Sequence, residues 1–214
     1  QKLLVAPIKF VKDSSDPKDN IDANDELLAK INLSFTGTDA ELSQAAGSNI
    51  YSVKSFYEQS SFGKGAFDVV VLPCWVEYTG TAKAFESQAG GQAGVSMSNY
   101  VKTWYKAEYA KADHGALGAS WQYTWKDFDS DNDGFIDLVW QVYAYPYTDT
   151  STEFWWAYVT YTGNQKNVAD PNIMTLAWAS TRFMDKFNGY DTHTFIHESG
   201  HLLGLSDYYD YSNY

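Results

Sequence analysis

Two histidines, His197 and His201, stand four residues apart near the end of this 214-residue sequence, followed by a glycine at position 204 and an aspartate at position 207. No other feature restricts the fold as strongly. Positions i and i+4 of an α-helix share one face, with Cβ atoms about 5–6 Å apart, so a helix brings two imidazoles to one point. We therefore predict a helix over residues 192–203. Gly204 can adopt a positive φ, which ends the helix and turns the chain back.

The five residues that begin at His197 match H-E-x-x-H, a pattern typical of zinc metallopeptidases. Zinc accepts histidine nitrogen and carboxylate oxygen, so His197, His201 and Asp207 are the candidate ligands. Glu198 is offset by about 100° on the helix and is the candidate base that takes a proton from a zinc-bound water. The alternative is an amphipathic helix with incidental histidines. His193 lies about 12 Å along the axis from His201, too far to share one metal, and is interpreted as a helix-start or supporting residue.

The segment over residues 127–137 contains five aspartates and a glycine and is the second candidate metal site. Carboxylates at alternating positions, with a glycine that permits a sharp turn, are typical of a calcium loop. The segment is not a complete EF-hand, because Trp140 stands where a bidentate glutamate is needed. A solvated acidic turn is the alternative. The candidate calcium ligands are Asp129, Asp131, Asp133, Asp137 and the backbone carbonyl of Phe135, with Asp127 as an additional candidate.

The composition excludes several classes of partner. A formal net charge of −12 argues against nucleic acid and anionic membranes, which both need a basic surface. Hydrophobic residues make up 44% of the chain, enough for a packed core, and no apolar run reaches the length of a membrane span. Cys74 is the only cysteine in the sequence, so we predict no intrachain disulfide and a buried, unreactive thiol. His114 is interpreted as structural.

Strand and helix patterns are mixed along the chain without a strict βαβ alternation, which favours an α+β fold with a mixed, twisted sheet and helices that include the metal-binding one. Residues 2–11 predict a buried strand, and Pro7 within it suggests a sheet edge or a bulge. Residues 80–98 are rich in glycine and predict a flexible surface loop. The remaining predicted elements are strands over 66–78, 136–145, 154–161 and 173–184, and helices over 51–59 and 97–111.

The metal motifs and two further segments resemble the immune inhibitor A family of secreted bacterial metallopeptidases. The zinc segment runs from Thr194 through Tyr208 and Tyr209 to Asp210, and the block from Asp129 to Asp137 is similar to the family's D-x-D-x-D-G-x-x-D block. Residues 52–64 resemble the family segment around "enSyGk", and residues 3–11 its first strand. The resemblance implies a zincin, metzincin-like fold, secretion from a bacterium, a catalytic zinc and a structural calcium.

The resemblance also implies how the domain is organised. Residues 1–214 are expected to form the N-terminal subdomain and active-site helix of a metallopeptidase catalytic domain. Metzincin-like peptidases have a methionine-containing turn beneath the zinc, and the thirteen residues that follow His201 contain no methionine. We therefore expect the C-terminal subdomain and its Met-turn to lie beyond Tyr214.

These patterns together predict a zinc-dependent endopeptidase that hydrolyses peptide bonds of extracellular proteins through a metal-activated water. The main alternative is a non-catalytic zincin-like binding module stabilised by calcium. A calcium-stabilised domain with an unrelated helix, and zinc hydrolysis of a non-peptide bond, are further alternatives. The expected partners are protein or peptide substrates. Oligomeric state and cleavage preference stay open.

Overall fold

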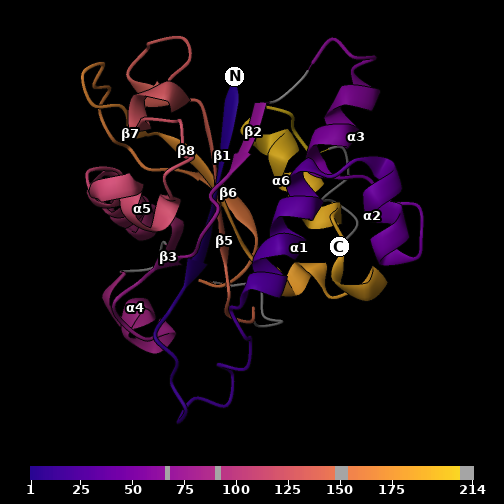
Figure 1. Ribbon diagram of the computed structural model, residues 1–214, viewed down its shortest axis with the longest axis horizontal. Helices are drawn as coiled ribbons and strands as arrows, with labels where there is room; N and C mark the ends of the chain where they lie inside the picture. The colour runs from indigo at the N-terminus through magenta and orange to yellow at the C-terminus, as the bar shows by residue number, and fades with distance from the viewer. Residues whose placement is uncertain (66–67, 90–92, 148–153, 208–214) are drawn as a thin grey trace.

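Helices cover both faces of a central β-sheet in the computed structural model (Figure 1), which describes residues 1–65, 68–89, 93–147 and 154–207. The main sheet has the order β2-β1-β5-β8-β6, and β3 extends it beside β1. All pairings in it are parallel except that of β6 with β8. The fold is therefore of the α+β class with a mixed sheet, as predicted. The strands are β1 (Lys2–Lys9), β2 (Asp68–Val71), β3 (Val76–Glu77), β5 (Leu138–Tyr143), β6 (Tyr158–Tyr161) and β8 (Thr175–Ser180), and a separate parallel pair is formed by β4 (Phe135–Ile136) and β7 (Asn172–Ile173).

The helices form two layers, one on each face of the sheet (Figure 1). Successive residues of a strand point to opposite faces and so contribute to two separate cores. On β5, Val139 and Tyr143 face one core, and Leu138, Trp140 and Val142 face the other. Both faces are buried, which explains the almost continuous apolar sequence of β1 and β5. The first core is closed by α4 (Ala82–Gln88) and α5 (Ala93–Tyr109); the second is closed by α1 (Asp25–Thr36), α3 (Val53–Ser60) and α6 (His193–Leu202), with α2 (Asp39–Ala46) outside them. Short 3-10 segments are η1 (Ala112–Leu117), η2 (Trp125–Phe128), η3 (Thr181–Met184) and η4 (Phe187–Gly189).

Pro7 does not mark a sheet edge, because β1 pairs on both sides. The carbonyls of Val5 and Lys9 accept hydrogen bonds from the side of the sheet that holds β2 and β3. Because the backbone groups of every second residue point to the same side of a strand, those of Pro7 also point toward β2 and β3. On that side the pairing stops after Val5 and resumes at Ile8. The missing N–H of proline thus falls where the neighbouring strand is interrupted.

The region from residue 66 to residue 98 differs most from the prediction. The single strand predicted over 66–78 is two strands, β2 and β3, separated by residues 72–75. The flexible loop predicted over 80–98 is wrong for its described part, because α4 and the first turn of α5 lie there. The Thr81 side chain accepts a hydrogen bond from the N–H of Ala84 and begins α4 as an N-cap. Gly90 and Gly91, part of the predicted loop, lie outside the described residues.

The helix α6 packs against the sheet through one buried face. Phe195 is fully buried between Phe35 and Trp140, with ring centroids 5.4 and 5.3 Å away. One turn later the indole N–H of Trp140 donates to the Ser199 hydroxyl at 2.9 Å. These contacts turn the opposite side of the helix, which carries His197 and His201, away from the sheet. None of the helices that the structure describes has the length and apolar character needed to cross a membrane.

Removing the Phe195 ring should weaken the packing of α6 against the sheet. We expect Phe195→Ala to lower the free energy of unfolding by about 3–5 kcal/mol, because a fully buried aromatic ring leaves a cavity. Tyr161→Ala is the control: that ring is 67% exposed, and its removal should cost about 0.5 kcal/mol or less. Urea denaturation measures the free energy of unfolding of both variants. Equal losses would contradict the described packing of α6 against the sheet.

Candidate metal centre

The predicted zinc ligands come together at the end of α6. The Nε2 atoms of His197 and His201 lie 3.1 Å apart. One carboxylate oxygen, Oδ1 of Asp207, lies 3.3 Å from the first nitrogen and 3.1 Å from the second. A tetrahedral zinc with ligand bonds of about 2.0–2.1 Å requires its ligand atoms to be about 3.3 Å apart. The three donor atoms therefore have the spacing that a single zinc ion needs.

The hydrogen bonding of His201 leaves the correct nitrogen available for a metal. Its Nδ1 lies 2.8 Å from the carbonyl oxygen of Leu205. A carbonyl only accepts, so Nδ1 carries the proton, and in the neutral ring Nε2 then presents a lone pair toward Asp207. An imidazole held in this way by a backbone carbonyl is the usual arrangement of a metal-binding histidine.

Gly204 creates this geometry by ending the helix as the sequence predicts. Its φ is +81°. The N–H of Gly204 donates to the carbonyl of His201, and the N–H of Leu205 donates to that of Gly200, both at 2.9 Å. This is the Schellman arrangement, in which a left-handed residue closes the last turn. The reversal aims the Leu205 carbonyl at one imidazole and carries Asp207 back over both.

Glu198 lies on the other side of the helix from the solvent and is 8% exposed. Burial raises the pKa of its carboxyl group to about 7; the neighbouring His201 acts against this rise, and the Asp207 carboxylate adds to it. A carboxyl group with a pKa near neutrality can both take up and release a proton. A dication held by the adjacent histidines would favour the ionised, proton-accepting form.

A cavity of about 630 Å³ opens beside the histidines, between α3 and α6. Its walls include both imidazoles and Asp207, so a molecule in it would contact the metal ligands directly. The apolar part of the lining is formed by Ile50, Tyr51, Phe56, Tyr57, Ile196 and Leu205. The cavity is thus large enough for a substrate segment and mostly apolar away from the histidines.

Three of the predicted calcium ligands also form a group. Carboxylate oxygens of Asp129, Asp131 and Asp137 lie within 4.8 Å of one another. Asp129 is 3% exposed and accepts bonds from the N–H groups of Asp133 and Gly134 at 3.0 and 3.1 Å. The φ of Gly134 is +93°, and a Cβ there would lie 2.8 Å from a backbone nitrogen of residue 167, so only glycine fits this turn.

The other two predicted carboxylates lie elsewhere. Asp133 is not in the group, and its Oδ1 accepts the N–H of Phe135 at 2.8 Å. Asp127 accepts both the N–H and the hydroxyl of Thr124, at 2.6 and 2.7 Å, and so closes the capping box of η2. Its side chain therefore has a structural partner of its own.

The residues interpreted as structural have local partners. His193 begins α6 and contacts Asp191 at 3.2 Å, with its side chain 89% exposed. The ring of His114 stacks on Tyr109 with centroids 4.2 Å apart. Cys74 is only partly buried, so the predicted full burial is wrong; its burial still raises the pKa of the thiol to about 12, in agreement with an unreactive thiol. The last residues of the predicted zinc segment, Tyr208, Tyr209 and Asp210, lie outside the described residues.

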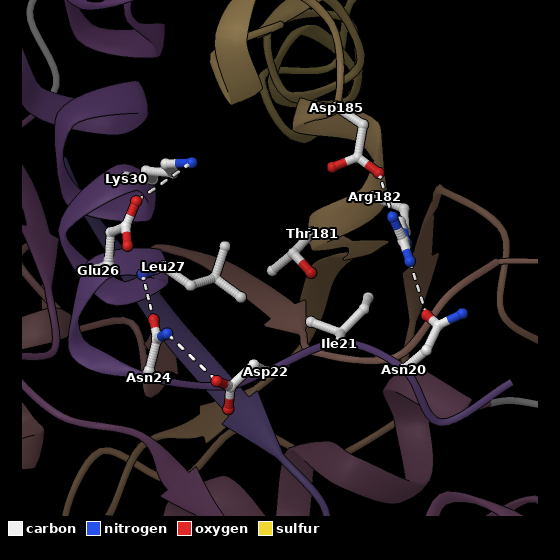
Figure 2. Close-up of a pocket in the computed structure, with 10 residues that line it drawn as sticks. All are labelled: Asn20, Ile21, Asp22, Asn24, Glu26, Leu27, Lys30, Thr181, Arg182 and Asp185. Atoms are coloured by element: carbon white, nitrogen blue, oxygen red, sulfur yellow. Dashed lines mark hydrogen bonds and ion pairs between the residues drawn. The ribbon is translucent and has the colours of Figure 1, made fainter. Parts of the chain in front are cut away.

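A second hollow of about 260 Å³ lies between the start of α1 and η3 and has no part in the metal centre (Figure 2). Four of its charged side chains form two pairs: Lys30 lies 3.8 Å from Glu26, and Arg182 lies 2.8 Å from Asp185. None of the candidate metal ligands lines it.

Sequence reasoning missed Leu205, Tyr57 and Ser199. Leu205 acts through its carbonyl, for which a sequence carries no signal beyond the helix-ending glycine before it. Tyr57 contacts α6, and Ser199 bonds α6 to the sheet, through partners that lie 139 and 59 residues away in the chain. Only the fold brings these partners together.

The turn at Gly204 gives a direct test of the centre. Gly204→Ala should lower the free energy of unfolding by about 1–2 kcal/mol, the cost of a left-handed conformation for a residue with a Cβ, and should weaken zinc binding because Asp207 and the Leu205 carbonyl shift. Gly47→Ala is the matched control: Gly47 ends α2 in the left-handed conformation with a φ of +69°, and a Cβ there would meet nothing closer than 3.5 Å. Thermal denaturation and zinc titration should show two similar stability losses but one affinity loss. Equal zinc affinity in both variants would argue against a role for the turn.

No protein-family model and no curated protein matches the sequence.

Proposed function

We propose that this chain is the catalytic part of a zinc-dependent endopeptidase with a zincin fold, secreted and acting on extracellular proteins, as its resemblance to immune inhibitor A peptidases implies. One observation carries the proposal: two imidazole nitrogens and a carboxylate oxygen lie 3.1–3.3 Å from one another, beside a buried glutamate. Metal-binding histidines usually bond their second ring nitrogen to a carbonyl or carboxylate, as Nδ1 of His201 does with Leu205, which also supports the proposal.

The residues present fit a zinc ion in number and donor type. His197, His201 and Asp207 would hold it, which is the three-ligand set of catalytic zinc sites. Zinc bound there would lower the pKa of a coordinated water from 15.7 toward about 7 and would polarise a substrate carbonyl.

The chain's own contribution to peptide hydrolysis is made by Glu198 and the cavity. Glu198 takes a proton from the attacking water as the water oxygen bonds to the carbonyl carbon of the scissile peptide. The same carboxyl group then gives that proton to the amide nitrogen as the carbon–nitrogen bond breaks, so a carboxylic acid and an amine leave the site. The cavity between α3 and α6 orients the peptide segment beside the imidazoles.

The Glu198 carboxyl group gives the decisive test. Glu198→Gln keeps the shape of the side chain but cannot accept a proton, so we expect it to retain one zinc per chain and to lose casein hydrolysis by about 10²–10⁴-fold. His197→Ala should lose the zinc as well. Glu26→Gln, at an exposed position on α1, is the matched control and should keep both properties.

The outcomes separate this function from its alternatives. Normal hydrolysis by Glu198→Gln would refute the role of the glutamate. Zinc retention in the full-length protein without cleavage of casein or peptides would instead favour a non-catalytic binding module. Absence of zinc in the wild-type chain would refute the metal centre itself.

We further propose a structural calcium at Asp129, Asp131 and Asp137. The grouping of three carboxylates at the start of β5, with Asp129 buried, supports the proposal because unshielded carboxylates this close repel each other. A hard cation with oxygen ligands would remove that repulsion.

Calcium should therefore stabilise the fold. At a calcium concentration 100 times its Kd we expect about 2.7 kcal/mol of added stability, which chelation with EGTA removes. Asp129→Asn should lose this calcium-dependent shift in melting temperature. Asp127→Asn is the control and should keep the shift, since Asp127 caps η2 and lies outside the group. A melting temperature that calcium and EGTA leave unchanged would contradict the proposal.

A further inference from the structure

Tyr57, which lies outside the candidate zinc segment, contacts α6 close to both histidines. Tyr57 extends from α3, and its hydroxyl donates a hydrogen bond of 2.7 Å to the carbonyl oxygen of Ile196. Ile196 directly precedes His197 in α6. Burial raises the pKa of the tyrosine hydroxyl to about 12, so it remains a donor at neutral pH. The bond therefore joins α3 to α6 immediately beside a candidate zinc ligand.

Gly200 gives this hydroxyl its space. Gly200 lies one turn after Ile196 and directly before His201. A Cβ at position 200 would lie only 3.0 Å from the Tyr57 hydroxyl oxygen, closer than side-chain carbons ordinarily approach. A glycine inside a helix costs stability relative to alanine, so its presence here needs a local reason. The close approach of Tyr57 supplies one.

The two contacts place one hydroxyl against both turns that carry the imidazoles. Ile196 and Gly200 are on the helix side that faces the cavity, and both line it together with His197 and His201. Movement of the Tyr57 ring would thus shift the backbone next to each ligand. The spacing of 3.1 Å between the two Nε2 atoms depends on where these turns lie.

We propose that Tyr57 is a positioning residue of the zinc centre: its hydroxyl fixes α6 against α3 at the turn between His197 and His201, and Gly200 is glycine so that the hydroxyl fits. This inference rests on the proposed function. It assigns Tyr57 no contact with zinc or with the reacting atoms. A purely structural tyrosine would stabilise the fold but leave the affinity and the coordination of the metal unchanged.

A double-mutant cycle tests the proposal with zinc affinity and the visible spectrum of the cobalt-substituted chain as readouts. Tyr57→Phe should weaken zinc binding by about tenfold, the lower end of the effect of removing a supporting partner. Gly200→Ala should weaken it similarly, because the new methyl group pushes the hydroxyl away from Ile196. In the Tyr57→Phe background the methyl group has room, so Gly200→Ala should there change the affinity by less than about twofold, which is a non-additive result. Both single variants should alter the cobalt spectrum.

Tyr51→Phe is the matched control. Tyr51 lines the same cavity; its backbone carbonyl accepts a bond from Thr192, and within the described part of the chain no hydrogen bond involves its hydroxyl. Removing that hydroxyl should leave zinc affinity and the cobalt spectrum as in the wild type. Urea denaturation of every variant verifies that the chain is folded when the metal is added.

The possible failures are distinguishable. If the wild-type chain binds neither zinc nor cobalt, the proposed function is wrong and the inference is wrong with it. If the wild-type chain binds metal and Glu198→Gln loses hydrolysis, the function stands. In that case, unchanged affinity and spectrum in Tyr57→Phe, or strictly additive effects of Tyr57→Phe and Gly200→Ala, would overturn the inference alone.

Discussion

The bond between the Trp140 indole and the Ser199 hydroxyl, together with the burial of Phe195, determines which face α6 presents to the cavity. Successive residues of an α-helix are about 100° apart, so a rotation by one position would bury an imidazole and expose an apolar ring. A buried polar partner resists such a rotation, because breaking it would leave the indole N–H unsatisfied inside the core. The orientation of His197 and His201 is therefore a property of the sheet as much as of the motif.

The end of α6 positions the remaining groups of the candidate metal centre. A single left-handed residue, Gly204, reverses the chain so that consecutive residues serve different purposes: the Leu205 carbonyl orients one imidazole, and Asp207 brings a carboxylate to both. Hydrogen-bond polarity then makes Nε2 of His201 the lone-pair nitrogen. A short turn thus brings a third candidate ligand, Asp207, to the two imidazoles that α6 presents.

Local patterns predicted what local geometry determines. The helix over 192–203, its stop at Gly204 and the approach of Asp207 follow from helical spacing and one positive φ, and the structure has all of them. The helices α1 and α2 were absent from the prediction, although Asn24 caps α1 by accepting the N–H of Leu27 at 2.9 Å. The break between β2 and β3, the exclusion of Asp133 from the acidic group and the approach of Tyr57 depend on partners distant in sequence, for which periodicity carries no signal.

The two candidate metal sites are connected through β5. Asp137 immediately precedes this strand; its carboxylate accepts the N–H of Lys2 at 2.8 Å, which ties β5 to the start of β1. Trp140 lies three residues further on, about 10 Å along the strand, and carries the bond to Ser199 on α6. A cation at the acidic group would hold the beginning of β5 and, with it, the indole that orients α6. The stability of that strand is thus the physical link between the acidic group and the geometry of the histidines.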